Sequence, residues 1–193
     1  MASVCFYFQV HQPYRLRQYS VFDTTPTYFA DDVNKEILEK VARKCYLPAT
    51  KLMLDLVRRH EGRFRIAYSL TGIIVQQCRD WCPEMIDLLG ELSDTGCCEF
   101  LAETYCHSLS FLYSHDEFRE QIDMHTKLMQ DLFGQTPTVF RNTELIYNND
   151  MAHFIAGMGR FRGIIAEGAD HILGYRSPNY LYTPPGVDGV KLL

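Results

Sequence analysis

The apolar run VCFYFQV, residues 4–10, contains one polar residue, Gln9, and is followed at once by His11-Gln12-Pro13. A short, nearly continuous apolar run is typical of a strand buried on both faces in a parallel sheet. Similar β-rich runs recur along the chain, each followed by polar residues. We therefore expect further strands at residues 64–70, 97–103, 139–142 and 163–167.

Helical patterns separate these runs. The first covers residues 34–60, where Pro48 predicts a break or kink between two helices. A later pattern begins at Ser114, which stands three residues before Glu117 and can cap a helix that ends at Gly134. The remaining helical patterns cover residues 71–81, 83–92 and 149–156. Strands that alternate with helices indicate an α/β fold of parallel βα units, arranged as an open sheet or a barrel.

The last residues, Val190-Lys191-Leu192-Leu193, have the pattern of a strand that is beginning. Five or six βα units are fewer than a closed eight-fold barrel contains. We therefore expect residues 1–193 to form one domain, the N-terminal portion of a catalytic barrel truncated after about five or six strands.

The composition excludes several classes of protein. With 47% hydrophobic residues, the chain of 193 residues can bury one sizeable core. The balance of 19 basic and 24 acidic residues lacks the basic patches that nucleic-acid binding requires. Since no stretch approaches the roughly 18 apolar residues that span a bilayer, we expect no membrane partner. The seven cysteines, an odd number without paired CxxC spacing, favour reduced thiols in a cytoplasmic protein over a zinc site.

Polar residues stand out at the ends of four of the expected strands, where a parallel fold places its ligand crevice. These groups should converge on one pocket although they are far apart in sequence; they lie at residues 11–13, 99–107, 141–147 and 167. Glu99, Leu101 and Glu103 share one strand face at period two, so one or both carboxylates should project into the core. A buried acid needs a partner or a chemical task.

Paired carboxyl groups suit retaining glycoside hydrolysis, in which one attacks the anomeric carbon and the other protonates the leaving oxygen. The chain offers Glu99, Glu103, Glu144 and Glu167 for these roles. Loop aromatics near them could stack on sugar rings: Tyr14, Tyr19, Phe22, Tyr105, Phe111, Tyr113, Tyr147, Tyr175, Tyr180 and Tyr182. Taken singly, such residues more often cap helices or pack loops, and only their joint pattern favours an enzyme.

Three motifs in this order resemble glycoside hydrolase family 57, and the likeness runs from Val4 to the end of the chain. The motifs are HQP at residues 11–13, EFLAETYCH at 99–107 and FRNTELIY at 140–147. The family contains α-amylases, 4-α-glucanotransferases, branching enzymes and amylopullulanases. The resemblance implies a parallel (β/α)7-type incomplete barrel, retaining chemistry on an α-glucan or maltooligosaccharide, and no metal or organic cofactor.

The resemblance also implies roles for individual residues. His11 would contact the sugar in the central subsite, with Gln12 beside it. The second motif supplies a glutamate and a histidine eight residues later, which fall on Glu99 and His107, and Glu103 is the competing choice because the strand register is open.

The third motif holds the nucleophile, which falls on Glu144. From the residues alone, Arg141 would help to keep that carboxylate ionised, and Tyr147 would shape the subsite.

One family feature has no match in this sequence. The fourth motif supplies an aspartate as general acid and base, and neither Asp170 nor Asp188 lies in a comparable setting. We expect this residue beyond Leu193, so that the chain alone would turn over slowly or not at all. The alternatives are a 4-α-glucanotransferase, an inactive truncated glucan-binding fragment, and a metal-dependent carbohydrate deacetylase, which would need an aspartate and two converging histidines.

Overall fold

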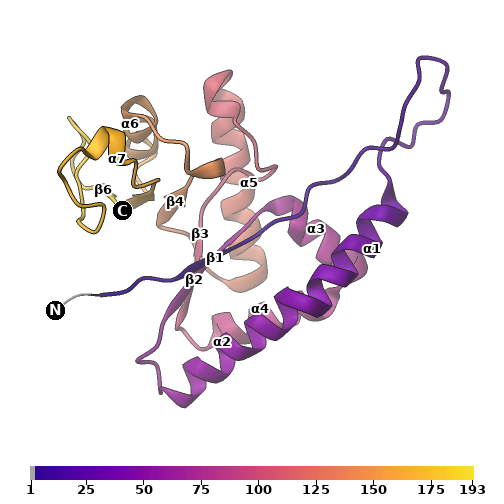
Figure 1. Ribbon diagram of the computed structural model, residues 1–193, viewed down its shortest axis with the longest axis horizontal. Helices are drawn as coiled ribbons and strands as arrows, with labels where there is room; N and C mark the ends of the chain where they lie inside the picture. The colour runs from indigo at the N-terminus through magenta and orange to yellow at the C-terminus, as the bar shows by residue number, and fades with distance from the viewer. Residues whose placement is uncertain (1–2) are drawn as a thin grey trace.

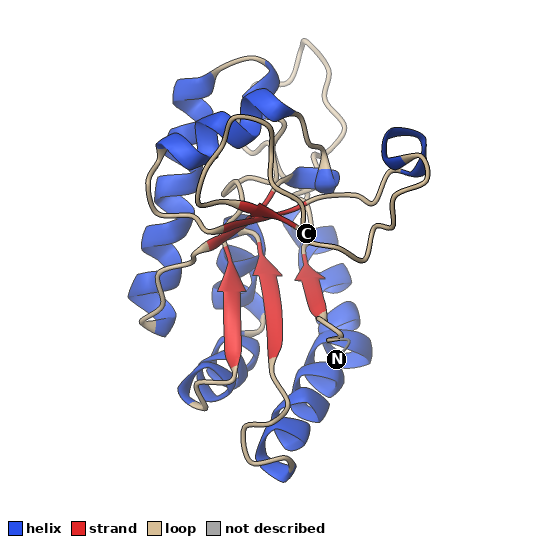
Figure 2. Ribbon diagram, turned by 90° about the vertical axis from the view of Figure 1, so that its left-hand side faces the viewer, coloured by secondary structure: helices blue, strands red, loops and turns tan. Residues whose placement is uncertain are grey.

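Six parallel strands build the wall of the molecule in the computed structural model, which describes residues 3–193. They are β1 (Tyr7–Val10), β2 (Ile66–Leu70), β3 (Cys98–Leu101), β4 (Val139–Arg141), β5 (Gly163–Ile165) and β6 (Lys191–Leu192). Two three-stranded sheets, β1-β2-β3 and β4-β5-β6, are joined by a parallel bridge between Ala102 and Phe140. Each strand therefore lies beside its neighbour in sequence, as in a barrel wall, and the prediction of a parallel α/β fold is confirmed (Figure 2).

The first helical pattern divides into two α-helices just before Pro48, as the sequence predicts, but the helical path does not break there. Helix α1 (Asp31–Val41), the π-helical turn η1 (Ala42–Tyr46) and α2 (Leu47–Arg59) form one continuous rod (Figure 1). The Leu47 N–H donates to the Ala42 carbonyl, five residues earlier. This wider turn shifts the hydrogen-bond ladder just before the proline, which itself cannot donate, so the helix continues.

The remaining helices follow the sequence pattern closely. They are α3 (Gly72–Trp81), α4 (Pro83–Asp94), α5 (His115–Phe133), α6 (Asn149–Gly157) and the short α7 (Asp170–Leu173). The Ser114 hydroxyl accepts the Glu117 N–H at 3.2 Å, as the capping pattern predicts, and Gly134 ends α5 with a φ of 66°. Two 3₁₀ turns, η2 (Ser110–Leu112) and η3 (Thr143–Leu145), follow β3 and β4.

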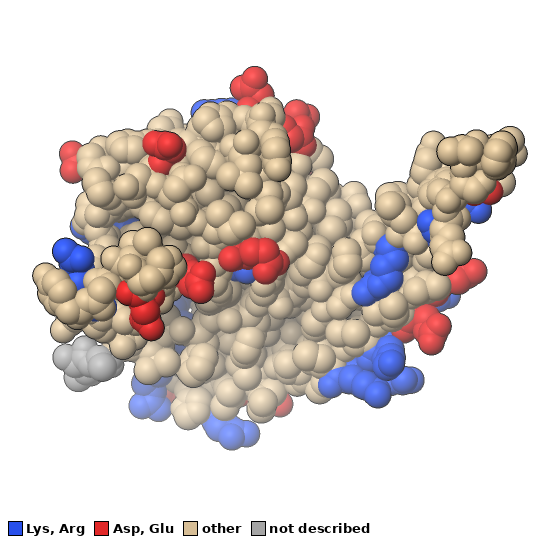
Figure 3. Space-filling model, turned by 45° about the horizontal axis from the view of Figure 1, so that its top comes forward, with Lys and Arg blue, Asp and Glu red and all other residues tan. Residues whose placement is uncertain are grey.

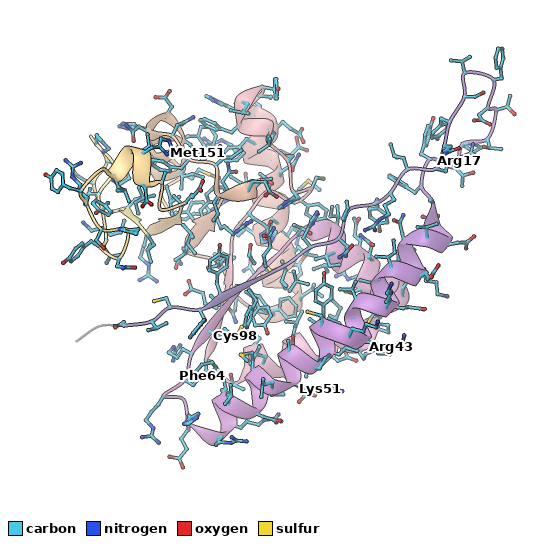
Figure 4. The ribbon with its side chains drawn as sticks, viewed as in Figure 1. Arg17, Arg43, Lys51, Phe64, Cys98 and Met151 are labelled. Atoms are coloured by element: carbon cyan, nitrogen blue, oxygen red, sulfur yellow. The ribbon has the colours of Figure 1, made fainter. Side chains whose placement is uncertain are left out.

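Two clusters of buried side chains form the core. The first joins β1–β3 to α1–α4 and includes Tyr68, Phe100 and Cys98. The second joins β4 and β5 to α5 and α6 and includes Phe140 and Met151. Figure 4 labels Cys98 and Met151, which lie in the two different clusters. Because the paired strands are parallel, their carboxyl ends lie at one edge, where polar side chains can gather.

A long loop between β1 and α1, residues 11–30, projects from the body as an arm (Figures 1 and 3). An isolated antiparallel bridge between Leu16 and Phe29 ties its two sides together. The arm leaves large apolar side chains in solvent, and Val21 and Phe22 are 93% and 88% exposed.

Gly72, the first residue of α3, allows close packing against the loop after β3. A Cβ at this position would lie 2.4 Å from the ring of Tyr105. We expect Gly72→Ala to lower the free energy of unfolding by roughly 1–3 kcal/mol, because the ring must move and loses its hydrogen bond from Gln76. A Cβ added at Gly90, in α4, would meet no atom within 4 Å, so Gly90→Ala should raise the free energy of unfolding by about 0.5–1 kcal/mol. Urea denaturation of both variants checks the pair, and equal effects would contradict the packing argument.

Candidate active site

Side chains from the ends of β1, β3 and β4 meet at one point. His11 follows β1 directly, His107 lies in the loop after β3, and Glu144 lies in η3. The imidazole rings of His11 and His107 are stacked, with centroids 4.0 Å apart and planes 25° apart. Nδ1 of His11 lies 3.0 Å from the Thr71 hydroxyl at the start of α3. Residues almost a hundred positions apart are therefore in contact, as the strand-end argument predicts.

His107 bridges two carboxylates. Its Nε2 lies 3.0 Å from Oε1 of Glu144, and its Nδ1 lies 3.5 Å from Oε2 of Glu103. The Glu103 side chain is fully buried, whereas the Glu144 side chain is 70% exposed. The Ser69 hydroxyl donates to the other oxygen of Glu103 at 2.6 Å. The result is a line of three groups, Glu103, His107 and Glu144, from the buried interior to the surface.

Glu144 stands on an unusual backbone. Glu144 and Leu145 have φ values of 54° and 57°, and His107 has a φ of 55°. Left-handed conformations at residues other than glycine cost of order 1 kcal/mol or more and cluster at functional sites. The turn is held by hydrogen bonds from Leu145 N to Asn142 O at 3.0 Å and from Ile146 N to Thr143 O at 3.2 Å. This turn aims the Glu144 carboxylate at solvent and at His107.

The pKa values of the two stacked histidines are shifted in opposite directions. Burial and the neighbouring His107 lower the pKa of His11 to about 4, despite the nearby carboxylates. The contact with the Glu103 carboxylate raises the pKa of His107, against the opposing effect of burial, and Glu144 adds to the increase. The pair therefore takes up its first proton on His107, and His11 stays neutral near pH 7.

Arg141 is buried at the end of β4. One of its terminal nitrogens, Nη2, donates to Oε1 of Gln9 at 2.8 Å, while Nε and Nη1 have no hydrogen-bond partner within residues 3–193. Its guanidinium lies 6.0 Å from the ring centroid of Tyr7. The positive charge lowers the pKa of both His11 and His107. The expected effect of Arg141 on the Glu144 carboxylate stays a prediction.

Two further predicted residues lie beside this cluster. The Gln12 amide donates to the Tyr46 hydroxyl at 3.2 Å, and its oxygen accepts from Arg15 at 3.0 Å. Tyr147 donates to Asn149 at 3.1 Å and, with Glu167 and Leu145, lines a cavity of about 550 Å³. Leu145, which lines this cavity, directly follows Glu144 in the chain.

Glu99 lies away from the cluster. It is the second residue of β3, accepts a hydrogen bond from Thr138 at 3.4 Å, and lines a hollow of about 300 Å³ with Phe6 and Leu101. Strand β3 ends at Leu101, so Glu103, the competing choice, lies at the carboxyl end of the strand. The structure therefore brings Glu103 and His107 together and leaves Glu99 near the beginning of the strand.

Sequence reasoning missed three supporting residues. Ser69 and Thr71, at the end of β2, hold Glu103 and His11. His125 in α5 is fully buried, and its Nε2 lies 2.6 Å from the Leu70 carbonyl. Burial lowers the pKa of His125, although the nearby Glu103 opposes this effect. In the sequence, each of these three residues is marked only as a polar residue inside an otherwise apolar pattern, which does not assign it to the site.

The deacetylase alternative and a zinc site at the cysteines would both need converging metal ligands. Within the described part of the chain, no cluster of three or more His, Cys, Asp or Glu side chains could hold a metal ion. The cysteines there are unpaired, and Cys78, Cys82, Cys97 and Cys98 are buried. In the same residues, no helix combines the length and the apolar character needed to cross a bilayer.

Histidine and carboxylate side chains thus gather at the carboxyl ends of parallel strands, where α/β folds built from βα units place their active sites. The chain belongs to glycosyl hydrolase family 57, whose sequence model matches residues 5–193. This confirms the family that the three motifs indicated.

A protein of Methanocaldococcus jannaschii described as "Putative alpha-amylase" is 44% identical over 195 residues, which cover 98% of this chain and 40% of that protein. The chain thus spans less than half the length of this relative. Among solved structures, 4-alpha-glucanotransferase from Thermococcus litoralis matches with a TM-score of 0.74 and 14% identity, over 98% of this chain and 27% of that one. A family 57 branching enzyme from Pyrococcus horikoshii matches with a TM-score of 0.68 and 16% identity, over 98% and 45%. These structural likenesses establish the fold.

Proposed function

We propose that this chain carries the nucleophile of a retaining glycoside hydrolase that acts on the α-1,4 bonds of α-glucans, within an incomplete (β/α)7 barrel. The observation that carries the proposal is the position of Glu144. It lies in the third family motif, at the end of β4, with its carboxylate 3.0 Å from His107 and open to solvent.

In this mechanism the Glu144 carboxylate attacks the anomeric carbon, and the glycosidic C–O bond breaks as the leaving oxygen takes a proton from a general acid. Water then cleaves the glycosyl-enzyme ester, and the sugar is released with its original anomeric configuration. His11 and His107 face the same point and would contact sugar hydroxyls. The adjoining cavity beside Tyr147 has room for further sugar units.

The general acid is the role that this cluster does not fill. Glu103 is fully buried and already bonded to Ser69, so it is poorly placed to protonate a leaving oxygen. Because the chain spans 40% of its M. jannaschii relative, we propose the activity for the protein at its natural length.

The stereochemistry of the product tests the proposed nucleophile. We expect the protein at its natural length to release the α-anomer from maltooligosaccharides, as followed by ¹H NMR in the first minutes, before mutarotation. Initial release of the β-anomer would mean direct attack by water and would exclude a covalent role for Glu144.

The chain lengths of the products separate hydrolysis from transfer. Hydrolysis gives only shorter chains, whereas a 4-α-glucanotransferase gives longer and shorter chains together. Chromatography of the same reaction mixtures therefore decides between the two activities, because the structural likeness to the T. litoralis enzyme concerns only the fold.

A further inference from the structure

We propose that Glu103 is a positioning residue that keeps a proton on His107, so that the imidazolium donates from Nε2 to the carboxylate of Glu144. This inference rests on the proposed nucleophilic role of Glu144 and adds a third group to it. No proton moves in the arrangement: the imidazolium holds the nucleophile ionised and oriented.

The first argument is the pairing of two otherwise unsatisfied atoms. Within residues 3–193, Oε2 of Glu103 and Nδ1 of His107 are buried and have no hydrogen-bond partner in the strict geometric sense. They face each other across 3.5 Å. A fully buried carboxylate is costly without a positive partner, and a protonated His107 supplies one. The Ser69 hydroxyl satisfies only the other oxygen.

The second argument concerns the charges around the ring. His107 is faced by the carboxylates of Glu103, after β3, and Glu144, in η3, which favour its protonation. Opposing them are burial of the ring and the guanidinium of Arg141, on β4. The ring of His11, after β1, stacks on His107. Since the pKa of His11 is about 4, that ring carries no charge at neutral pH and opposes protonation only weakly.

A fifth group lies behind Glu103. His125, on α5, is fully buried, and its pKa is lowered by that burial, so it stays neutral and does not compete for the negative charge. Within residues 3–193, the basic group in ion-pair contact with Glu103 is His107.

The third argument is orientation. The contact at Nδ1 fixes which ring nitrogen faces the interior, so Nε2 must point at Glu144, 3.0 Å away. His107 and Glu144 both have left-handed backbones, which leave little freedom to realign the pair by other means. A glutamine at position 103 would keep the volume and lose the charge that anchors the imidazolium.

The test follows the protonation of His107 directly. Protein labelled with ¹⁵N-histidine is titrated by NMR, with His107→Gln used to assign the signals. We expect both ring nitrogens of His107 to show the imidazolium shift at pH values where His11 is neutral, and Glu103→Gln to move the titration midpoint to lower pH. Glu99→Gln, a carboxylate change on the same strand but away from the cluster, should leave the midpoint unchanged.

An unchanged midpoint in a folded Glu103→Gln protein would overturn the inference. If that variant does not fold, the wild-type spectrum decides, because a neutral His107 ring at pH 6 would overturn it equally. A structural role for Glu103 alone would lower stability without moving the His107 midpoint.

Activity gives an independent readout in the protein at its natural length. The sign follows from the pKa: activity that needs the imidazolium falls as pH rises through the pKa of His107. Glu103→Gln should therefore shift this alkaline limb of kcat/KM to lower pH. Failure of the NMR test with Glu144 still essential removes only this inference, whereas full activity without the Glu144 carboxylate removes the proposed function.

Discussion

The Glu144→Gln variant is expected to lose turnover of maltooligosaccharides by roughly 10⁴-fold or more, because an amide cannot form the glycosyl-enzyme ester. The side chain is 70% exposed and its replacement is nearly isosteric, so the fold should be retained. The measurement is kcat/KM in the protein at its natural length, together with the circular dichroism spectrum and the unfolding midpoint.

Two further variants sharpen this result. Glu120→Gln removes an exposed carboxylate on α5, outside the proposed site, and should leave turnover within a few-fold of wild type. Glu144→Gly with added azide should regain turnover and give a glycosyl azide of inverted configuration, because azide replaces the missing nucleophile. Normal turnover by Glu144→Gln would remove this residue from the role.

The Phe140→Ala variant is expected to lose about 3–5 kcal/mol of the free energy of unfolding. Phe140, on β4, is 0% exposed and packs edge-on against Phe118, with ring centroids 5.7 Å apart, and against Phe161 at 5.9 Å. Truncation therefore opens a cavity where β4 meets α5, and β4 leads directly into the turn that carries Glu144. Urea denaturation followed by fluorescence measures the loss.

The matched control makes the same substitution, phenylalanine to alanine, at a position exposed to solvent. Phe22, in the arm, is 88% exposed, so Phe22→Ala should change stability by no more than about 0.5 kcal/mol. Similar losses in both variants would contradict the assignment of Phe140 to the core.

Much of the fold could be predicted because apolar runs and helix caps are local signals. The strand-end rule also predicted that His11, His107 and Glu144 would converge, since parallel strands bring their carboxyl ends to one edge. The continuous helix through Pro48 could not be predicted in the same way. The local pattern shows that proline cannot donate, but it does not show the π turn that moves the ladder one residue earlier.

The choice between Glu99 and Glu103 depended on a strand boundary. Period two places both residues on one face, and only the end of β3 at Leu101 decides which lies at the carboxyl edge. The left-handed backbone at His107 and Glu144 was equally hidden, because no glycine marks either position. Such strain depends on tertiary contacts, and three of the four left-handed non-glycine residues in the described part of the chain, His107, Glu144 and Leu145, lie at the proposed site, while Glu61 lies in the turn after α2.

The left-handed pair at Glu144 and Leu145 has an evolutionary consequence. Glycine would adopt these backbone angles at lower conformational cost than either side chain, so selection for thermal persistence alone would tend to bring it to these positions. A lineage that kept the fold but no longer used the carboxylate should therefore drift toward glycine in this turn. Under the proposed role of Glu144, glycine at this position would mark a descendant that kept the fold without the chemistry.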